Sequence, residues 1–154
     1  MIWQSHGHLV IGTLHTKGCA ETIDRIINFY EVRDQAQIKN LLSSLLKAVV
    51  SQRLLKSNKG KGLVLVPEVM LVDNTVAACI RKEKFSVSEI EDAIQGGHEK
   101  GSISLTNSLA ELYVDGKLTL DQVKAQIDEK NWESLNRTIM QLNLKRNAAR
   151  MANK

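Results

Sequence analysis

Near its start the chain reads Gly7-His8-Leu9-Val10-Ile11-Gly12-Thr13-Leu14-His15-Thr16. The part from Leu9 to Leu14 is almost continuously apolar, which is typical of a strand that is buried on both faces of a parallel sheet. Ligands of open α/β sheets bind beyond the carboxyl ends of the strands, where this run ends in hydroxyl and imidazole groups. We therefore expect Thr13, His15 and Thr16 to lie at a ligand site, although polar turn residues follow strands in any α/β protein.

Helical and strand patterns alternate through the rest of the first half. Apolar residues three and four apart predict a helix from about Cys19 to Phe29 and a second, leucine-rich helix around residues 38–46, which we expect to pack on the sheet. Residues 48–55 and 63–72 are rich in β-branched and aliphatic side chains, and the lysine- and glycine-rich segment between them predicts a hairpin turn. Pro67 lacks an amide donor, so its strand should lie at an edge or contain a bulge.

From Phe85 onward the pattern is helical. Ser86 and Glu89 have the spacing of a capping box, which predicts a helix that starts at Val87 and ends near Gly97. Further helices are expected over residues 105–114, after the Thr119-Gln122 capping box, and around Trp132, Leu135, Ile139 and Leu142. We therefore divide the chain into an α/β portion (residues 1–84), a helical subdomain (85–130) and a terminal helix with a basic tail (131–154).

Composition narrows the class of protein. The 154 residues suffice for one domain, or for one domain with a small helical appendage. Two cysteines outside any C-x-x-C pair indicate reduced thiols, and the sequence shows neither a signal peptide nor about 18 uninterrupted apolar residues. We therefore expect a soluble, cytoplasmic protein without a transmembrane segment. An aromatic content of 4% argues against base stacking, so neither DNA nor RNA is expected as a partner.

The net charge of +4 is concentrated at the carboxyl end, where Lys145, Arg146, Arg150 and Lys154 occur with no acidic residue among the last ten positions. Such a tail could contact nucleic acid or an anionic membrane. Cations also suit the C-terminus of a helix, so a solvated helix end explains the same residues.

Two kinds of site are not supported by the motifs. The sequence contains no G-x-x-x-x-G-K-[ST] phosphate-binding loop. His6 and His8 would point to the same side of a strand, but His15 lies an odd number of positions beyond His8 and would point to the other side. We therefore predict no metal site.

Several segments occur together in a fixed order: Gly7–Val10, Gly12–Thr16, Thr22–Ile26, Ala48–Leu55, Glu68-Val69 and Ala93–Gln95. In this combination the chain resembles the twitching-motility retraction ATPases of type IV pili, members of the secretion ATPase superfamily, from about Gly7 to about Ile127. The resemblance implies an α/β fold, namely the C-terminal part of a RecA-like P-loop ATPase domain followed by an all-helical subdomain. It also implies a family of hexameric rings that use ATP and Mg²⁺.

The same resemblance assigns roles to individual residues. His15 corresponds to the histidine of the family's histidine box, which lies near the γ-phosphate, and Thr13 and Thr16 are its nucleotide-adjacent neighbours. Residues 75–82 correspond to the Ala-Ile-Arg-Asn-Leu-Ile-Arg-Glu signature of retraction and keep only Arg81 of its two arginines. The family's phosphate loop (Walker A), its magnesium-associated acidic strand (Walker B) and its aspartate box would all precede Met1.

These observations predict a C-terminal fragment, or a separately encoded half, of a type IV pilus retraction motor. Phosphoryl transfer needs a phosphate cradle, a lysine and magnesium, so we expect the isolated chain to bind no cofactor tightly and not to hydrolyse ATP. The resemblance implies docking on a P-loop half or on full-length ring subunits, contact with the pilus inner-membrane machinery, and a peripheral position at the inner membrane. A non-enzymatic interaction module and a degraded gene product remain as alternatives, and the sequence leaves open whether the chain itself is an enzyme.

Overall fold

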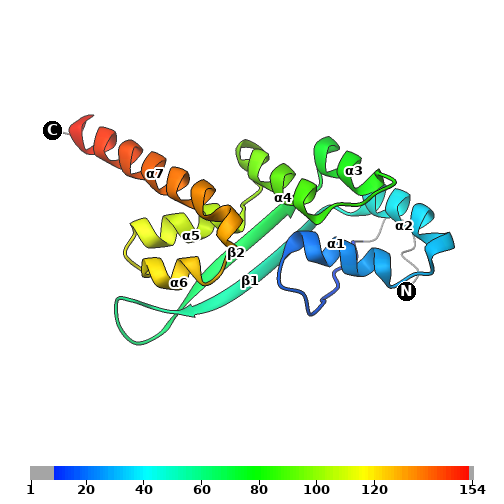
Figure 1. Ribbon diagram of the computed structural model, residues 1–154, viewed down its shortest axis with the longest axis horizontal. Helices are drawn as coiled ribbons and strands as arrows, with labels where there is room; N and C mark the ends of the chain where they lie inside the picture. The colour runs from blue at the N-terminus through cyan, green and yellow to red at the C-terminus, as the bar shows by residue number, and fades with distance from the viewer. Residues whose placement is uncertain (1–8, 153–154) are drawn as a thin grey trace.

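A computed structural model describes residues 9–152 of the chain, and Figure 1 shows a long two-stranded hairpin with helices packed along it. Strands β1 (Ala48–Lys56) and β2 (Leu63–Leu71) pair antiparallel from Ala48↔Leu71 to Lys56↔Leu63 without a bulge. The helices are α1 (Cys19–Asn28), α2 (Val32–Leu45), α3 (Asn74–Arg81), α4 (Val87–Gly96), α5 (Leu105–Val114), α6 (Leu120–Lys124) and α7 (Trp132–Ala152), with short 3-10 turns η1 (His98–Lys100) and η2 (Glu129–Asn131).

Local sequence signals account for where most helices begin. The side chains of Asp73, Ser86, Ser104 and Thr119 each accept a backbone N–H from the first turn that follows them. The capping box predicted at Thr119 is complete, whereas at Ser86 only half of it forms, because the Glu89 carboxylate pairs with Lys82 instead. The predicted hairpin and the predicted helices over residues 19–29, 87–97 and 105–114 are confirmed to within about two residues.

The two faces of the hairpin differ in burial. On β2 the alternate residues Val66, Glu68 and Met70 are buried under the helices. On the opposite face Val50 and Leu54 are exposed to 66% and 61%, and their cross-strand neighbours are apolar too. Pro67 lies on this outer face and pairs with Gln52, so the prediction of an edge position is confirmed in a sheet whose strands are both edges.

Two clusters of buried side chains meet on the inner face of the hairpin. Met70 belongs to a cluster that it forms with residues of α1 to α4, namely Cys19, Ala20, Ile23, Ile27, Leu42, Val76, Ile80, Ile90 and Ile94. Val66 belongs to a second cluster with Leu109, Ala110, Leu118, Val123 and Leu135 from the α5–α7 region. The helices of both clusters therefore pack against inward-facing residues of the same strand, β2 (Figure 1).

Two sequence-based predictions are wrong. Residues 9–14 form no strand, and Leu9 and Ile11 are exposed to 81% and 86%. A strand needs a neighbour for its backbone hydrogen bonds, and within residues 9–152 no third strand pairs with this segment. Helix α2 packs mainly against α3 and α1 rather than on the sheet, because α1, α4 and α5 already occupy the inner face of the narrow hairpin.

The division at residues 84 and 130 stays a prediction. Among residues 9–152, no helix has both the length and the apolar character that crossing a bilayer demands.

The burial pattern predicts a contrast between two leucine-to-alanine changes. Leu109→Ala empties a fully buried position in the second cluster and should lower the free energy of unfolding by about 2–5 kcal/mol. Leu54→Ala makes the same chemical change on the outer face of the hairpin and should cost less than about 0.5 kcal/mol. Urea unfolding followed by circular dichroism measures both values, and equal losses would contradict the assignment of the two faces.

Candidate functional site

The segment that contains His15 is held by the first turns of α1. The guanidinium of Arg25 donates a hydrogen bond to the carbonyl oxygen of His15 at 3.1 Å. The hydroxyls of Thr16 and Thr22 lie 2.7 Å apart, and the Thr22 hydroxyl also lies 2.8 Å from the carbonyl oxygen of Gly18. A hydroxyl carries one hydrogen, so Thr22 donates to Gly18 and Thr16 donates to Thr22. The backbone around His15 is therefore anchored although it is not a strand.

Arg53, on the inner side of β1, ties this segment to the C-terminal helices. One nitrogen of its guanidinium donates to the carbonyl oxygen of Lys17 at 2.9 Å, and the other donates to the carbonyl oxygen of Gln126 at 2.9 Å. Ser51, the preceding residue on the same side of β1, also donates to Lys17, at 3.4 Å. A single cation thus satisfies two backbone acceptors that lie far apart in the sequence.

Glu68 lies at the N-terminus of α1. Its Oε2 atom accepts a hydrogen bond from the backbone N–H of Cys19 at 3.0 Å, and its side chain is buried. A carboxylate at this end of a helix is favourable because the first N–H groups have no partner within the helix. Burial nevertheless raises the pKa of Glu68, and the Cys19 N–H and the charge of Arg53 oppose that rise only in part.

Cys19 is part of the same arrangement. Its thiol lies within hydrogen-bonding distance of the backbone oxygens of Val49, at 3.3 Å, and Glu68, at 3.5 Å. Burial, and secondarily the neighbouring Glu68 charge, raise the pKa of the thiol to about 12. Because the thiolate is the reactive form, Cys19 behaves as a small core residue rather than as a nucleophile.

A cleft of about 130 Å³ opens beside these residues. Its lining includes Arg53 together with the carboxyl groups of Glu21, Glu68, Glu91 and Asp92. Partial desolvation raises the pKa of Glu91 as well, although this residue is exposed at the surface. Carboxylates repel phosphate oxygens, so the cleft does not fit a nucleotide by itself. Within residues 9–152 no group of three or more potential metal-binding side chains comes together.

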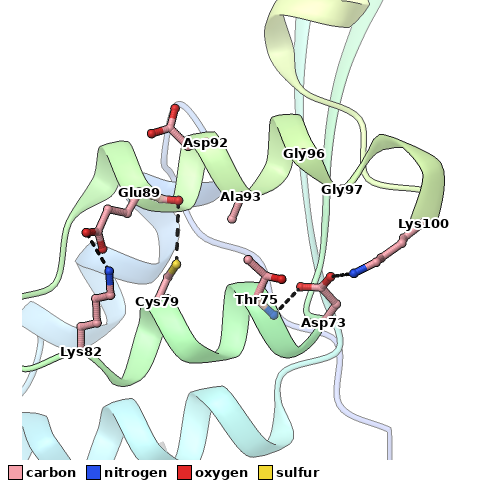
Figure 2. Close-up of a pocket in the computed structure, with 10 residues that line it drawn as sticks. All are labelled: Asp73, Thr75, Cys79, Lys82, Glu89, Asp92, Ala93, Gly96, Gly97 and Lys100. Atoms are coloured by element: carbon pink, nitrogen blue, oxygen red, sulfur yellow. Dashed lines mark hydrogen bonds and ion pairs between the residues drawn. The ribbon is translucent and has the colours of Figure 1, made fainter.

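A larger cleft of about 380 Å³ lies between α3 and α4, as Figure 2 shows. Two ion pairs stand along it, Lys82 with Glu89 at 2.8 Å and Lys100 with Asp73 at 2.6 Å. The hydrogen bond from Lys100 holds the pKa of Asp73 below its ordinary value, and the N–H of Val76 adds to the effect. Four of the five charged side chains that line this cleft are therefore paired with each other, and Asp92 is the fifth.

The predicted site residues are not gathered in one place. Thr13 and His15 are exposed, and Thr16 is half-buried. These three residues are close to one another because they are close in the sequence. Arg81 is on α3, where its guanidinium donates to the Ser43 hydroxyl of α2 at 3.2 Å. Thr75 and Cys79, from the segment that resembles the retraction signature, line the larger cleft, whereas Arg81 does not. His6 and His8 lie outside the described residues, and the roles of His15, Thr13, Thr16 and Arg81 stay predictions.

Sequence reasoning missed the importance of Arg53 and Glu68. A usable signal exists, since each is a charged residue at an inward position of a strand whose other inward residues are mostly apolar. Alternation alone shows that such a charge needs a partner. It does not show that the partners are Lys17, Cys19 and Gln126.

Comparisons with known proteins agree on one family. The model of the family described as type II/IV secretion system protein matches residues 4–125. The twitching motility protein of Neisseria gonorrhoeae is 37% identical over 110 residues, which cover 71% of this chain and 29% of that protein. The type IV pilus retraction ATPase PilT of Pseudomonas aeruginosa is 36% identical over 125 residues, which cover 80% of this chain and 36% of that protein. The chain thus spans about a third of the length of these relatives.

Solved structures give the same result. The pilus retraction motor PilT with bound ADP superposes with a TM-score of 0.69 at 30% identity, over 84% of this chain and 36% of that one. The ATPase DotB of Legionella pneumophila reaches a TM-score of 0.56 at 16% identity, over 72% of this chain and 29% of that one, which shows a shared fold. The predicted resemblance and the predicted fold class, a portion of a RecA-like ATPase followed by helices, are confirmed.

The buried Glu68 predicts a pH dependence of stability. Its pKa is higher in the folded chain than the ordinary 4.5, so between these two values the folded state binds more protons and stability falls as pH rises. Glu68→Gln keeps an acceptor for the Cys19 N–H and removes the charge, so the variant should lose less stability than the unchanged chain over that range. Urea midpoints measured from mildly acidic to neutral pH test this.

The exposed Glu99→Gln on η1 is the matched control and should keep the slope of the unchanged chain. Identical slopes for Glu68→Gln and the unchanged chain would show that the Glu68 carboxyl is not the group responsible.

Proposed function

The chain belongs to the type II/IV secretion system protein family, and from this membership we propose that it is the C-terminal part of a type IV pilus retraction ATPase. It is either a fragment or a separately encoded half. In this proposal the chain completes a motor only when a P-loop part, on the same or on another polypeptide, docks against it.

The exposed apolar surface is the observation that carries the proposal. Leu9 and Ile11 are exposed to 81% and 86%, and the outer face of the hairpin exposes Val50 and Leu54. Each such side chain would gain roughly 1.5–3 kcal/mol if it were fully buried. The matched relatives are about three times longer than the aligned segment. Residues that correspond to the rest of these relatives would bury the exposed apolar side chains.

We propose that the chain alone does not hydrolyse ATP. Its sequence holds no phosphate-binding loop, and the cleft nearest to Arg53 and Glu68 is lined by carboxylates. His15, Thr13 and Thr16 would come to lie beside a nucleotide and its Mg²⁺ only after the P-loop part has docked. Arg81 would then act in retraction through α3, the helix that separates the larger cleft from α2.

The partners follow from the same proposal. Full-length retraction ATPase subunits or a separate P-loop half would bind the chain, and a hexameric ring would be the assembled form. The working position would be cytoplasmic, at the pilus machinery of the inner membrane.

A second candidate is a non-enzymatic interaction module. Residues 126–154 lie beyond the family match, and they include the whole of the 21-residue α7. In this case the helices would be the working surface and the N-terminal segment would be a scaffold. Leu9→Gln with Ile11→Gln distinguishes the two candidates, because it should abolish partner binding in the first and leave it unchanged in the second.

The proposed function predicts an activity that appears only on mixing. The purified chain should show no ATP turnover, and adding the P-loop-bearing N-terminal part of a retraction ATPase should restore turnover and give a complex on size-exclusion chromatography. His15→Ala should leave the complex intact and abolish the restored turnover. His98→Ala, at an exposed histidine of η1, is the matched control and should change neither. ATP hydrolysis by the chain alone that His15→Ala abolishes would refute the proposal, as would a failure to form any complex.

A further inference from the structure

Helix α7 presents a surface that the family match does not account for. It runs from Trp132 to Ala152, and its last turns extend beyond α5 and away from the hairpin (Figure 1). We propose that the outer face of α7 is a docking surface for an anionic lipid bilayer, on which the helix lies parallel to the membrane plane. This proposal is independent of the proposed function, because the surface lies outside residues 4–125.

One side of α7 is used to hold the helix on the body of the chain. Leu135 is fully buried, and Ile139 and Leu142 pack against the second cluster. Arg146 donates to the carbonyl oxygen of Val114 and forms an ion pair with Asp115, directly after the end of α5. This ion pair also holds the pKa of Asp115 below its ordinary value. The helix is thus fixed up to Arg146, and the turns that follow project.

The other side of α7 carries an exposed apolar stripe. Met140, Leu144 and Met151 are exposed to 65%, 59% and 79%. With about 100° between successive residues, these three side chains fall within roughly 40° of one another and form a line about 16 Å long. The stripe faces away from the side that carries Leu135, Ile139 and Leu142. Its apolar area has no cover among the described residues.

Cations flank this stripe on both sides. Lys145 and Arg150 are exposed and lie roughly 100–120° to either side of the stripe, while Arg137 lies close to its line. Among the described residues, none of these three cations has a carboxylate within 4.0 Å. Long basic side chains can lay their alkyl stems along an apolar surface and extend their charged ends to lipid phosphates.

The charge of α7 indicates which kind of partner fits its exposed face. Helix α7 carries four cations, Arg137, Lys145, Arg146 and Arg150, against one carboxylate, Glu133, in its first turn. A second copy of α7 would bring like charges together, which disfavours a symmetric dimer on this face. Nucleic acid would neutralise the cations but leave the methionines and the leucine against water. An anionic bilayer matches both features, because its headgroups meet the cations and its acyl boundary receives the apolar stripe.

Vesicle co-sedimentation of the full chain tests this inference. The chain should bind vesicles of phosphatidylglycerol and phosphatidylcholine in equal parts, bind phosphatidylcholine vesicles far more weakly, and dissociate as salt is raised. Lys145→Gln with Arg150→Gln should weaken binding roughly thirty-fold, since each cation near an anionic surface contributes about a five-fold factor. Leu144→Gln with Met151→Gln should weaken binding to both kinds of vesicle. All four side chains are exposed, so circular dichroism should show unchanged folding.

Two matched variants control for charge and for apolar surface in general. Lys61→Gln with Lys84→Gln removes the same charge from exposed positions elsewhere, and Phe29→Gln with Val32→Gln removes exposed apolar groups from the region between α1 and α2. Both should bind anionic vesicles like the unchanged chain. Equal binding to neutral and anionic vesicles, equal losses in the control variants, or binding to an acidic peptide with none to vesicles would each overturn the proposal.

Discussion

Strand β2 places three alternate side chains, Val66, Glu68 and Met70, on one face, and both clusters of the chain depend on that spacing. Met70 belongs to the cluster of α1–α4 and Val66 to that of α5–α7. Glu68 lies between them and accepts the first N–H of α1. A shift of the strand register by one residue would turn all three side chains outward, so neither cluster could form without the correct pairing of β1 with β2.

The polar contacts at this point reinforce the apolar ones. Burying Glu68 costs free energy, as its raised pKa shows, and the cost is offset by the Cys19 N–H and by the nearby Arg53. Arg53 in turn fixes Lys17 on one side and Gln126 on the other. The N-terminal segment, the hairpin and the C-terminal helices are therefore connected through one carboxyl group and one guanidinium.

The elements that the sequence predicted correctly depend on local interactions. A capping box, a turn rich in glycine, and the spacing of leucines act over a few residues, so α4, α5, α6 and the hairpin follow from the sequence. The failed strand at residues 9–14 had an equally clear local pattern. Its conformation depends on a neighbouring strand, and such a partner is a property of the assembled sheet rather than of the segment. The position of α2 failed for the same reason, because competition for the inner face involves α1, α4 and α5.

Part of the candidate site could likewise be predicted from the sequence, and part could not. His15 and its threonines were found because a resemblance can be read along a short segment, whereas Glu68 and Arg53 contact residues that are 49 and 73 positions away in the chain.

The exposed apolar surfaces of the chain also depend on groups that are distant or absent from the segment itself. The apolar run at residues 9–14 has the pattern of a strand, but it could form one only if a larger sheet supplied a neighbouring strand. Its exposure and its sequence together therefore indicate that a partner covers it. Helix α7 fits a different kind of partner. Cations flank its apolar stripe, whereas the outward-facing residues of β1 include one cation, Lys56, at the end of the strand. In Figure 1 α7 and the helices α1 and α2 lie toward opposite ends of the hairpin.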